Sequence, residues 1–346
     1  MDSILASAPG RAGIVGNPSD MYGGSVLSCS TYERAYCVLS PADRLTIEAA
    51  GEEQEIRTPE DLEPRKDRLD ISKAVIKWFN LDIEDARFSL STKTDIPENA
   101  GLAGSTALLI CVFSCVAEYL GMDMKPHEVA ENARKVEANV MGITCGFQDQ
   151  YMAVFGGLNY IDFHGKESLL QLESEPFATL EPLSDLVDRT PFVVAHTGIK
   201  RHSGQVHRSV RERWLEGEQK VVEGYKRAAE MAGLAKKALI EERWEDLGAF
   251  MNENHAIQQK LGASGEVNDR LIEIARQNGA LGAKLAGAGH GGTIVALTFD
   301  TEATIKALTE AGAHRILIPR PSPGLSVQRV SQATLAAGNN LAVVNY

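Results

Sequence analysis

The sequence lacks the features that mark membrane proteins and nucleic-acid-binding proteins. Its longest apolar run, residues 107–116, is interrupted by Ser114 and is far shorter than the roughly 18 residues that a membrane span needs. The 35 basic and 47 acidic residues give a net charge of −12, with no long run of either sign. An acidic surface repels phosphodiester backbones and anionic lipid headgroups, so we expect neither nucleic acid nor a membrane as a partner.

Paired cysteines and an export signal are also absent. The five cysteines, at 29, 37, 111, 115 and 145, form an odd number without any C-x-x-C spacing, which favours reduced thiols in the cytoplasm. Cys111 and Cys115 lie four residues apart on one predicted helix, where buried small hydrophobic residues are a better interpretation than metal ligands. The first residues contain no basic region followed by an apolar core, so we expect no signal peptide and a cytoplasmic protein.

The length of 346 residues predicts two domains, because a domain typically has about 100–200 residues. The first half alternates strand and helix patterns, and the polar section 167–185 predicts the crossing between domains. The second half opens with a strand at 191–196, continues with helices, and is expected to end its domain with a strand at 324–330. We therefore predict an N-terminal domain at 1–175 and a C-terminal domain at 176–346.

The most informative stretch is residues 96–109, which read IPENAGLAGSTALL. Gly101 and Gly104 let the backbone turn tightly and approach a ligand closely, while Ser105 and Thr106 stand where a helix pattern begins. The start of a helix has unpaired N–H groups and the positive end of the helix dipole, so a phosphate group is a natural ligand. A capped helix that follows a glycine turn and binds nothing is the alternative, and this stretch alone does not decide between them.

Two other segments concentrate glycine or positive charge. Residues 284–292 read KLAGAGHGG and precede a strand, which permits close backbone approach to a ligand or tight packing. Residues 196–214 read HTGIKRHSGQVHRSVRERW, a basic segment that is either a solvated helix face or the rim of an anion site. The common nucleotide-binding templates do not fit, since there is no G-x-x-x-x-G-K-[ST] string and no G-x-G-x-x-G opens a first crossover helix.

Taken in order, the glycine-bearing segments resemble the GHMP kinase family, which includes galactokinase, homoserine kinase and mevalonate kinase. The first motif of that family, A-P-G-[RK] followed by a strand and a polar loop, resembles APGR at 8–11 and GNPSD at 16–20. The second, P-x-x-x-G-L-x-S-S-A, resembles 97–106, and the third, which ends in G-A-G-x-G-G, resembles 284–292. The resemblance implies an α+β fold of two domains, with an N-terminal mixed sheet with helices and a ferredoxin-like C-terminal half.

The resemblance also implies ATP and Mg²⁺ as cofactors and a set of site residues. The galactokinase motif C-G-x-x-D-Q resembles CGFQDQ at 145–150 and implies that Asp149 takes the proton of the acceptor hydroxyl or orients that hydroxyl. Arg11 would lie against Asp149, and Ser105 with Glu137 would bind Mg²⁺; for Ser105, an N-cap role alone is the alternative. The implied phosphate-binding residues are Pro97, Gly101, Leu102, Ala103, Gly104, Ser105, Thr106, Gly287 and Gly289. The implied substrate-binding residues are Arg11, Asn17, Asp20, Gln150, Lys200 and Arg211.

Within the family the match is closest to the glucuronokinases, through the GNPSD loop, the additional glycine Gly104 and the run 148–163. That match implies a sugar 1-kinase that transfers the γ-phosphate of ATP to the anomeric hydroxyl of a free sugar acid, D-glucuronate. Asn17 and Pro18 stand where galactokinases have Glu and His, which argues against galactose. The alternatives are another GHMP kinase, acting on a neutral sugar or a heptose phosphate, and a non-catalytic regulator of the same fold. The sequence leaves open whether the protein is a monomer or a homodimer.

Overall fold

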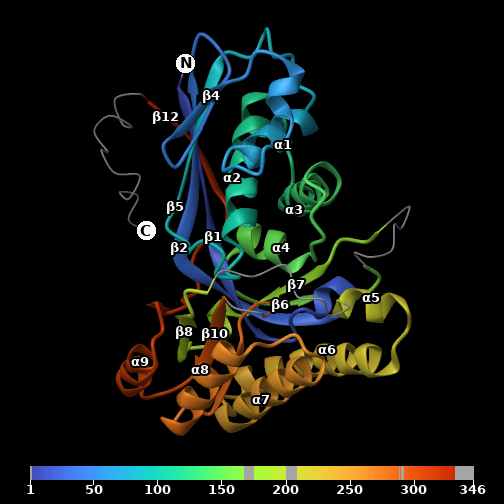
Figure 1. Ribbon diagram of the computed structural model, residues 1–346, viewed down its shortest axis with the longest axis vertical. Helices are drawn as coiled ribbons and strands as arrows, with labels where there is room; N and C mark the ends of the chain where they lie inside the picture. Colours follow the sequence, from blue (N-terminus) through green and yellow to red (C-terminus); the bar gives the residue numbers. More distant parts are fainter. Residues whose placement is uncertain (1, 167–174, 200–208, 288, 290–291, 332–346) are drawn as a thin grey trace.

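The computed structural model describes residues 2–166, 175–199, 209–287, 289 and 292–331, which fold around two β-sheets (Figure 1). The first sheet has the strand order β12-β1-β2-β5-β3-β4, and β6 and β7 extend it from β2. Its strands pair antiparallel except for β3 with β5, which are parallel, so the sheet is mixed. The strands are β1 (Ser3–Val15), β2 (Ser25–Pro41), β3 (Thr46–Ala49), β4 (Glu52–Glu55), β5 (Phe88–Thr94), β6 (Leu158–Asp162), β7 (Thr179–Pro182) and β12 (Ser326–Val330).

The second sheet has the strand order β11-β8-β10-β9, and its pairs are antiparallel. Its strands are β8 (Phe192–His196), β9 (Gly282–Leu285), β10 (Thr293–Leu297) and β11 (Arg315–Leu317). Along the chain, β8 is followed by helices, then by β9 and β10, by one more helix and by β11, which is the β-α-β-β-α-β order of ferredoxin-like folds. The predicted α+β class, with a mixed N-terminal sheet and an antiparallel C-terminal sheet, is confirmed.

One group of helices covers one side of the first sheet, and a second group lies at the end of the molecule that holds the second sheet (Figure 1). Figure 1 shows α1–α4 on the same side of the long strands β1 and β2, whereas α6–α9 lie at the other end. Helix α2 is apolar nearly all round and buried along most of its length, as the sequence predicts for a helix packed against a sheet. No helix in the described part of the chain combines the length and hydrophobicity that crossing a bilayer requires. The helices are α1 (Asp70–Trp78), α2 (Gly104–Tyr119), α3 (Pro126–Lys135), α4 (Gln148–Phe155), α5 (Val210–Leu215), α6 (Gln219–Ile240), α7 (Trp244–Lys260), α8 (Glu266–Gln277) and α9 (Thr301–Glu310).

Two strands lie beyond the predicted domain boundary but belong to the first sheet. Strand β7 pairs with β6, so the chain leaves the first sheet after Pro182 and enters the second at Phe192. Strand β12 pairs with β1, so the strand predicted at 324–330 joins the first sheet rather than the second. This pairing covers an edge of β1 that would otherwise present unpaired backbone groups, a long-range effect that local patterns do not reveal. The division at 175 and 176 stays a prediction.

Arg34 of β2 holds the segment that leads into β12. Its side chain is buried, and its guanidinium donates to the carbonyls of Pro323 at 2.6 Å and Gly324 at 2.7 Å. It also donates to the carbonyl of Ser7 in β1 at 3.0 Å. One side chain therefore ties the first strand of the chain to the returning C-terminal segment.

Replacing Arg34 by Met is expected to lower the free energy of unfolding by about 3 kcal/mol, because buried carbonyl groups lose a charged donor. Urea unfolding followed by circular dichroism measures the change. Arg44→Met is the matched control, since Arg44 pairs with Glu55 at 2.7 Å but its side chain is 68% exposed. Such a surface pair contributes at most about 1 kcal/mol. Equal losses in the two variants would contradict the role assigned to Arg34.

Candidate active site

The turn at residues 101–103, called the phosphate turn from here on, leads into α2 with the geometry of a helix start. Helix α2 begins at Gly104, and its N-cap is Ala103, which has a left-handed φ of 61°. Ser105 is therefore not the N-cap; it lies in the first turn with an exposed side chain. The intrahelical bond from Ala107 N–H to the Ala103 carbonyl measures 2.9 Å, and the amides of Gly104, Ser105 and Thr106 precede it in the first turn. These amides and the helix dipole favour an anion at this point.

Glycines from the other two motifs pack directly against this turn. A Cβ atom on Gly10 would lie 2.8 Å from the carbonyl of Leu102, and one on Gly287 would lie 2.7 Å from the carbonyl of Gly101. Such distances are too short for a Cβ atom, so a side chain at either position would displace the turn. The backbone N–H of Arg11 also donates to the carbonyl of Leu102 at 3.0 Å. The three glycine-bearing segments therefore meet at one place in the fold.

A cavity of about 1000 Å³ opens beside the turn. The predicted site residues that line it are Arg11, Asn17, Asp20, Pro97, Gly101, Ala103, Gly104, Ser105, Thr106, Glu137, Asp149 and Gly287. Leu102, Gln150, Gly289 and Arg211 do not line it, and Lys200 lies outside the described residues. Most of the predicted residues are therefore brought together around a single space.

Arg11 and Asp149 form an ion pair in the cavity wall. The Nε and Nη2 atoms of Arg11 both contact Oδ1 of Asp149, at 2.8 and 2.7 Å. Its Nη1 atom donates to the carbonyls of Gly101 at 2.7 Å and Ala286 at 3.2 Å. Arg11 lies in β1 and is buried, whereas the Asp149 side chain, in the first turn of α4, is 33% exposed. The pair therefore fixes the position of the Asp149 carboxylate relative to the phosphate turn.

Asp20 is held at the start of α4. Its Oδ2 atom accepts the backbone N–H groups of Phe147 at 2.9 Å and Gln148 at 3.1 Å. A Cβ atom on Gly146 would lie 1.9 Å from the same oxygen, so glycine at this position lets Asp20 reach the helix start. Burial raises the pKa of Asp20, and the two hydrogen bonds oppose part of that rise. The start of α4 thus presents two carboxylates to the cavity, its own Asp149 and the bound Asp20.

Glu137 lies on a π-helical turn, η3 (Val136–Val140), that follows α3 directly. Its Oε2 atom accepts from Thr106 Oγ1 at 3.2 Å and from Gln150 Nε2 at 2.8 Å. Burial, together with the charge of Asp149, raises the pKa of Glu137 to about 7. Turns of this kind occur frequently at functional sites. Gln150, which the sequence predicts at the substrate, is 1% exposed and contacts Glu137 instead.

Cys145 also lines the cavity, close to these carboxylates. Burial raises the pKa of its thiol to about 12, so the sulfur stays protonated at neutral pH and is not an activated nucleophile. Among the described residues there is no group of three or more His, Cys, Asp or Glu side chains able to hold a metal. The arrangement suits chemistry that depends on carboxylates and on a bound anion rather than on a thiolate.

Part of the cavity wall has no counterpart in the sequence analysis. Ala49 of β3, Ile71 of α1, Thr92 of β5 and Leu108 of α2 all line it. Leu108 lies in the stretch 96–109 but has no predicted role there, and the other three residues belong to no motif, so only the three-dimensional arrangement identifies this wall. Lys284, which the sequence analysis treats as the first residue of a motif, is fully buried beside the cavity wall.

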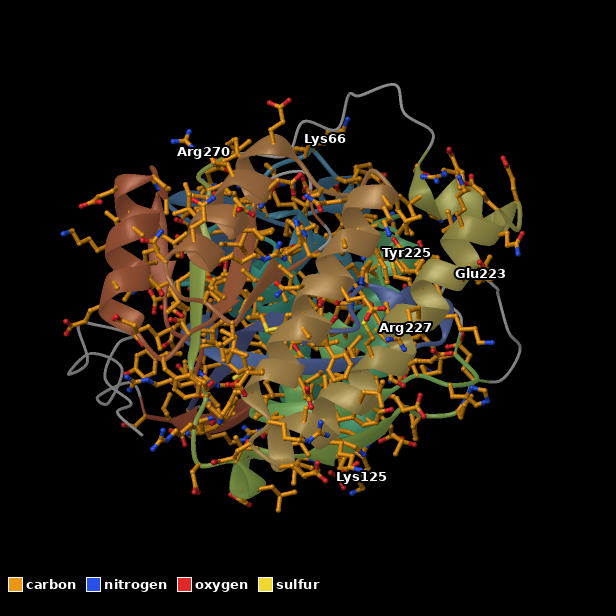
Figure 2. All side chains as sticks on the ribbon, turned by 90° about the horizontal axis from the view of Figure 1, so that it is seen from below. Lys66, Lys125, Glu223, Tyr225, Arg227 and Arg270 are labelled. Atoms are coloured by element: carbon orange, nitrogen blue, oxygen red, sulfur yellow. The ribbon has the colours of Figure 1, made fainter. Side chains whose placement is uncertain are left out.

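The basic segment contributes α5, which packs near the loop that carries Asp20. The ring of Trp214 lies 4.9 Å from that of Tyr22, which closes the short helix η1 (Ser19–Tyr22). Tyr22 in turn stacks at 4.5 Å on Tyr225 of α6. Figure 2 labels Tyr225 on α6, which runs beside α7. Burial raises the pKa of Tyr22 to about 12, and the nearby charge of Arg211 opposes part of that rise. Arg211 itself is exposed, and it is not among the residues that line the cavity.

Comparison with known proteins adds the family. Residues 70–157 match the GHMP kinases N terminal domain, and residues 235–314 match the GHMP kinases C terminal domain. A mevalonate kinase of Pyrococcus horikoshii is 30% identical over 354 residues, which cover 95% of this chain and 99% of that protein. Glucuronokinase 1 of Arabidopsis thaliana is 27% identical over 321 residues, which cover 87% of this chain and 86% of that protein.

A solved structure has the same fold. The crystal structure of a D-glycero-D-manno-heptose 1-phosphate kinase from Bacteroides thetaiotaomicron matches with a TM-score of 0.73 at 22% identity. The match covers 95% of this chain and 100% of that one. The names of these proteins differ in the acceptor and agree in the class of reaction. The chain therefore belongs to the GHMP kinase family, and it is an ATP-dependent small-molecule kinase.

Proposed function

We propose that this kinase transfers the γ-phosphate of ATP to the anomeric 1-hydroxyl of a free sugar acid, D-glucuronate, and releases ADP and glucuronate 1-phosphate. The observation that carries the proposal is the ion pair of Arg11 with Asp149, in one cavity with the phosphate turn and Asp20. Support for the acceptor comes from the GNPSD loop at 16–20 and from the Arabidopsis thaliana relative named Glucuronokinase 1.

The phosphates of ATP are assigned to the first turn of α2. Phosphoryl transfer depends on positioning and charge neutralisation more than on covalent chemistry, and the amides of Gly104, Ser105 and Thr106 supply N–H donors at the positive end of the helix dipole. The apolar side chains of Ile71 and Leu108 line the part of the cavity next to α1 and α2. An apolar wall suits the flat face of a purine, so the adenine ring is assigned there.

Mg²⁺ is assigned to Ser105 and Glu137. Both side chains offer oxygen atoms to the same cavity, and oxygen is the ligand type that Mg²⁺ prefers. Glu137 fits this role because burial raises its pKa to about 7, and a neighbouring cation favours the charged form of a buried carboxylate. When bound there, the ion would neutralise charge on the phosphates.

Asp149 is assigned to the acceptor hydroxyl. Both contacts from Arg11 go to Oδ1, and no hydrogen bond joins Oδ2 to another described side chain, so Oδ2 is the atom proposed to take the hydroxyl proton. The guanidinium of Arg11 also fixes the position of this carboxylate relative to the phosphate turn. A well-placed general base of this kind contributes about 10²–10⁴-fold to a reaction rate.

Recognition of the acceptor is assigned to the loop 16–20 and to nearby cations. Asp20 uses Oδ2 for the start of α4 and is proposed to accept sugar hydroxyls through Oδ1. Gln150 holds Glu137 through a 2.8 Å bond, so its proposed role is to orient that carboxylate. The carboxylate of the sugar acid needs charged donors, and Lys200 and Arg211 remain the proposed ones.

Mevalonate is a second candidate acceptor. The observation that favours it is the Pyrococcus horikoshii mevalonate kinase, which is 30% identical over nearly the full length of both chains. Mevalonate and glucuronate are both hydroxy acids, so the same elements would serve either: a base for the hydroxyl and a cation for the carboxylate. A heptose phosphate is a further alternative, in line with the relative from Bacteroides thetaiotaomicron.

The acceptor is tested by ADP release with ATP, Mg²⁺ and a panel of D-glucuronate, D-galacturonate, D-galactose, a heptose phosphate and mevalonate. We expect kcat/KM for D-glucuronate to exceed that for each neutral sugar by at least about tenfold, because an unpaired charged donor in the site penalises them. Turnover of a neutral sugar or heptose phosphate alone would show the proposal to be wrong, and turnover of mevalonate alone would establish the second candidate. No release with any acceptor would point to the non-catalytic regulator.

Asp149→Asn is expected to lower kcat by about 10²–10⁴-fold, because the variant keeps the shape of the side chain but cannot take a proton. The KM for ATP should change little, since Asp149 lies on the acceptor side of the phosphate turn. Steady-state kinetics with the acceptor chosen by the panel measure both constants. Asp123→Asn, at a side chain that is 92% exposed, is the control. Phosphorylation at the wild-type rate in the Asp149 variant would overturn its assigned role.

Replacing Lys200 and Arg211 together by Ala is expected to raise the KM for D-glucuronate by about tenfold, because the substrate carboxylate loses charge-assisted donors. The KM for ATP should rise less. Lys220→Ala, an exposed cation on α6, is the matched control and should leave both constants unchanged. Equal rises in the two constants would instead indicate a general electrostatic effect of the basic segment.

A further inference from the structure

A fully buried lysine lies directly behind the loop assigned to the acceptor. Lys284, in β9, is 0% exposed. Its ammonium group donates to Asn17 Oδ1 at 2.7 Å, to the Gly13 carbonyl at 3.3 Å and to the Leu285 carbonyl. An ammonium group has three N–H donors and no acceptor, so these contacts use its whole capacity. The Nδ2 atom of Asn17 donates to the Gly287 carbonyl at 3.4 Å, which fixes the other side of the same amide.

The backbone of residues 13–16 is also held, by hydrogen bonds to the residue after β9 and to α7. The N–H of Gly13 donates to the Ala286 carbonyl at 3.0 Å. The N–H of Gly16 donates to Oδ1 of Asn254, a buried residue of α7, at 2.9 Å. Residues 13–17 are therefore tied to the end of β9 and to α7, just before the chain reaches Asp20.

The environment of Lys284 differs from that of the other buried lysines described. Lys73 and Lys166 are each 1% exposed, and each pairs with two carboxylates. Among the described residues, the partners of Lys284 are neutral oxygens, and burial, with the nearby charge of Arg11, lowers its pKa well below the usual value. Moving a cation out of water costs several kcal/mol, and an apolar side chain of similar volume avoids that cost. This unfavourable burial indicates that the function of Lys284 lies in its contacts with Gly13 and Asn17.

We propose that Lys284 is a positioning residue for the acceptor site. It orients the amide of Asn17 and thereby the loop 16–20 that carries Asp20, and it does not line the cavity or contact the phosphate turn. The proposal rests on the proposed function, in which this loop faces the acceptor. Because Oδ1 of Asn17 accepts from Lys284 and Nδ2 donates to the Gly287 carbonyl, Asn17 acts as the link between Lys284 and the loop.

The kinetic test compares Lys284→Met, which keeps the length of the side chain and removes its donors, with the wild type. The KM for the acceptor is expected to rise about tenfold, as the loss of hydrogen bonds from a charged group implies, while the KM for ATP stays within about twofold. The acceptor is D-glucuronate, or whichever member of the panel has the highest kcat/KM. Lys166→Met removes an equally buried lysine. This control should reduce stability without raising the KM for the acceptor more than the KM for ATP.

A double-mutant cycle with Asn17→Ala tests the link. If Lys284 acts through Asn17, Lys284→Met should raise the acceptor KM in the wild-type background and change it less than about twofold in the Asn17→Ala background. Independent, multiplicative effects of the two substitutions would overturn the link. A rise of equal size in both KM values would overturn the restriction to the acceptor side.

Hydrogen–deuterium exchange needs no acceptor, so it separates this proposal from the identity of the substrate. In Lys284→Met we expect faster exchange at the amides of Gly13 and Gly16 and unchanged exchange in α2, because local opening follows the loss of local contacts. If D-glucuronate is inert and the loop exchanges faster, the proposed acceptor is wrong and the role of Lys284 stands. Unchanged exchange in residues 13–17 would overturn that role.

Two further variants keep the proposal testable if Lys284→Met does not fold. Lys284→Gln retains N–H donors in a shorter side chain and should show the same separation of KM values with a smaller rise. Asn254→Ala removes the acceptor of the Gly16 N–H from the side of α7 and should increase exchange in the same loop. Wild-type exchange and wild-type KM values in both variants would refute the proposal.

Discussion

The guanidinium of Arg11 joins the parts of the molecule that phosphoryl transfer has to bring together. Its donors reach Asp149 in α4, the carbonyl of Gly101 in the phosphate turn and the carbonyl of Ala286 after β9. These segments are far apart in sequence. A guanidinium is planar and its donors have fixed directions, so a shift of any partner breaks a contact. Asp149, the proposed base, and the proposed phosphate turn are therefore held at a set separation, which is the condition for electrostatic preorganisation.

Around this centre, the environment of each carboxylate determines its task. Asp149 has a cation beside it and is partly exposed, whereas burial raises the pKa of both Asp20 and Glu137. Backbone N–H groups at the start of α4 donate to Asp20 and offset part of the cost of its burial. Two neutral side chains donate to Glu137 in the same way, and in the proposed function they leave room for a cation. In the proposed function, three carboxylates that line one cavity serve as base, as metal ligand and as acceptor of hydrogen bonds from hydroxyl groups, because their surroundings differ.

Local features of the sequence predict the phosphate turn and the helix that follows it, because glycine spacing and apolar periodicity act over short distances. The pairing of β12 with β1 depends on contacts between the two ends of the chain, which no local pattern encodes. The N-cap of that helix depends on backbone conformation rather than on residue type: Ser105 is a favoured N-cap type, but the left-handed backbone at Ala103 determines where α2 begins. The sequence places Lys284 in a motif but does not predict its burial, because lysine is usually exposed. The wall near Ile71 is not predicted because apolar residues carry no chemical mark of a ligand site.

The short segment 284–287 has contacts on both sides of the reaction. Its Gly287 packs on the carbonyl of Gly101 in the phosphate turn, whereas Lys284 holds Asn17 at the loop assigned to the acceptor. Between them, the Ala286 carbonyl accepts from the guanidinium of Arg11. Phosphoryl transfer requires the acceptor oxygen and the phosphorus to approach within roughly 3–3.5 Å. Since the phosphate turn and the loop 16–20 both contact the same few residues of one strand end, this segment helps to set the spacing between them, through the backbone of Gly287 and the side chain of Lys284. The glycines of this motif, which suggest a ligand site when read from sequence, are needed as much for that close packing as for the ligand itself.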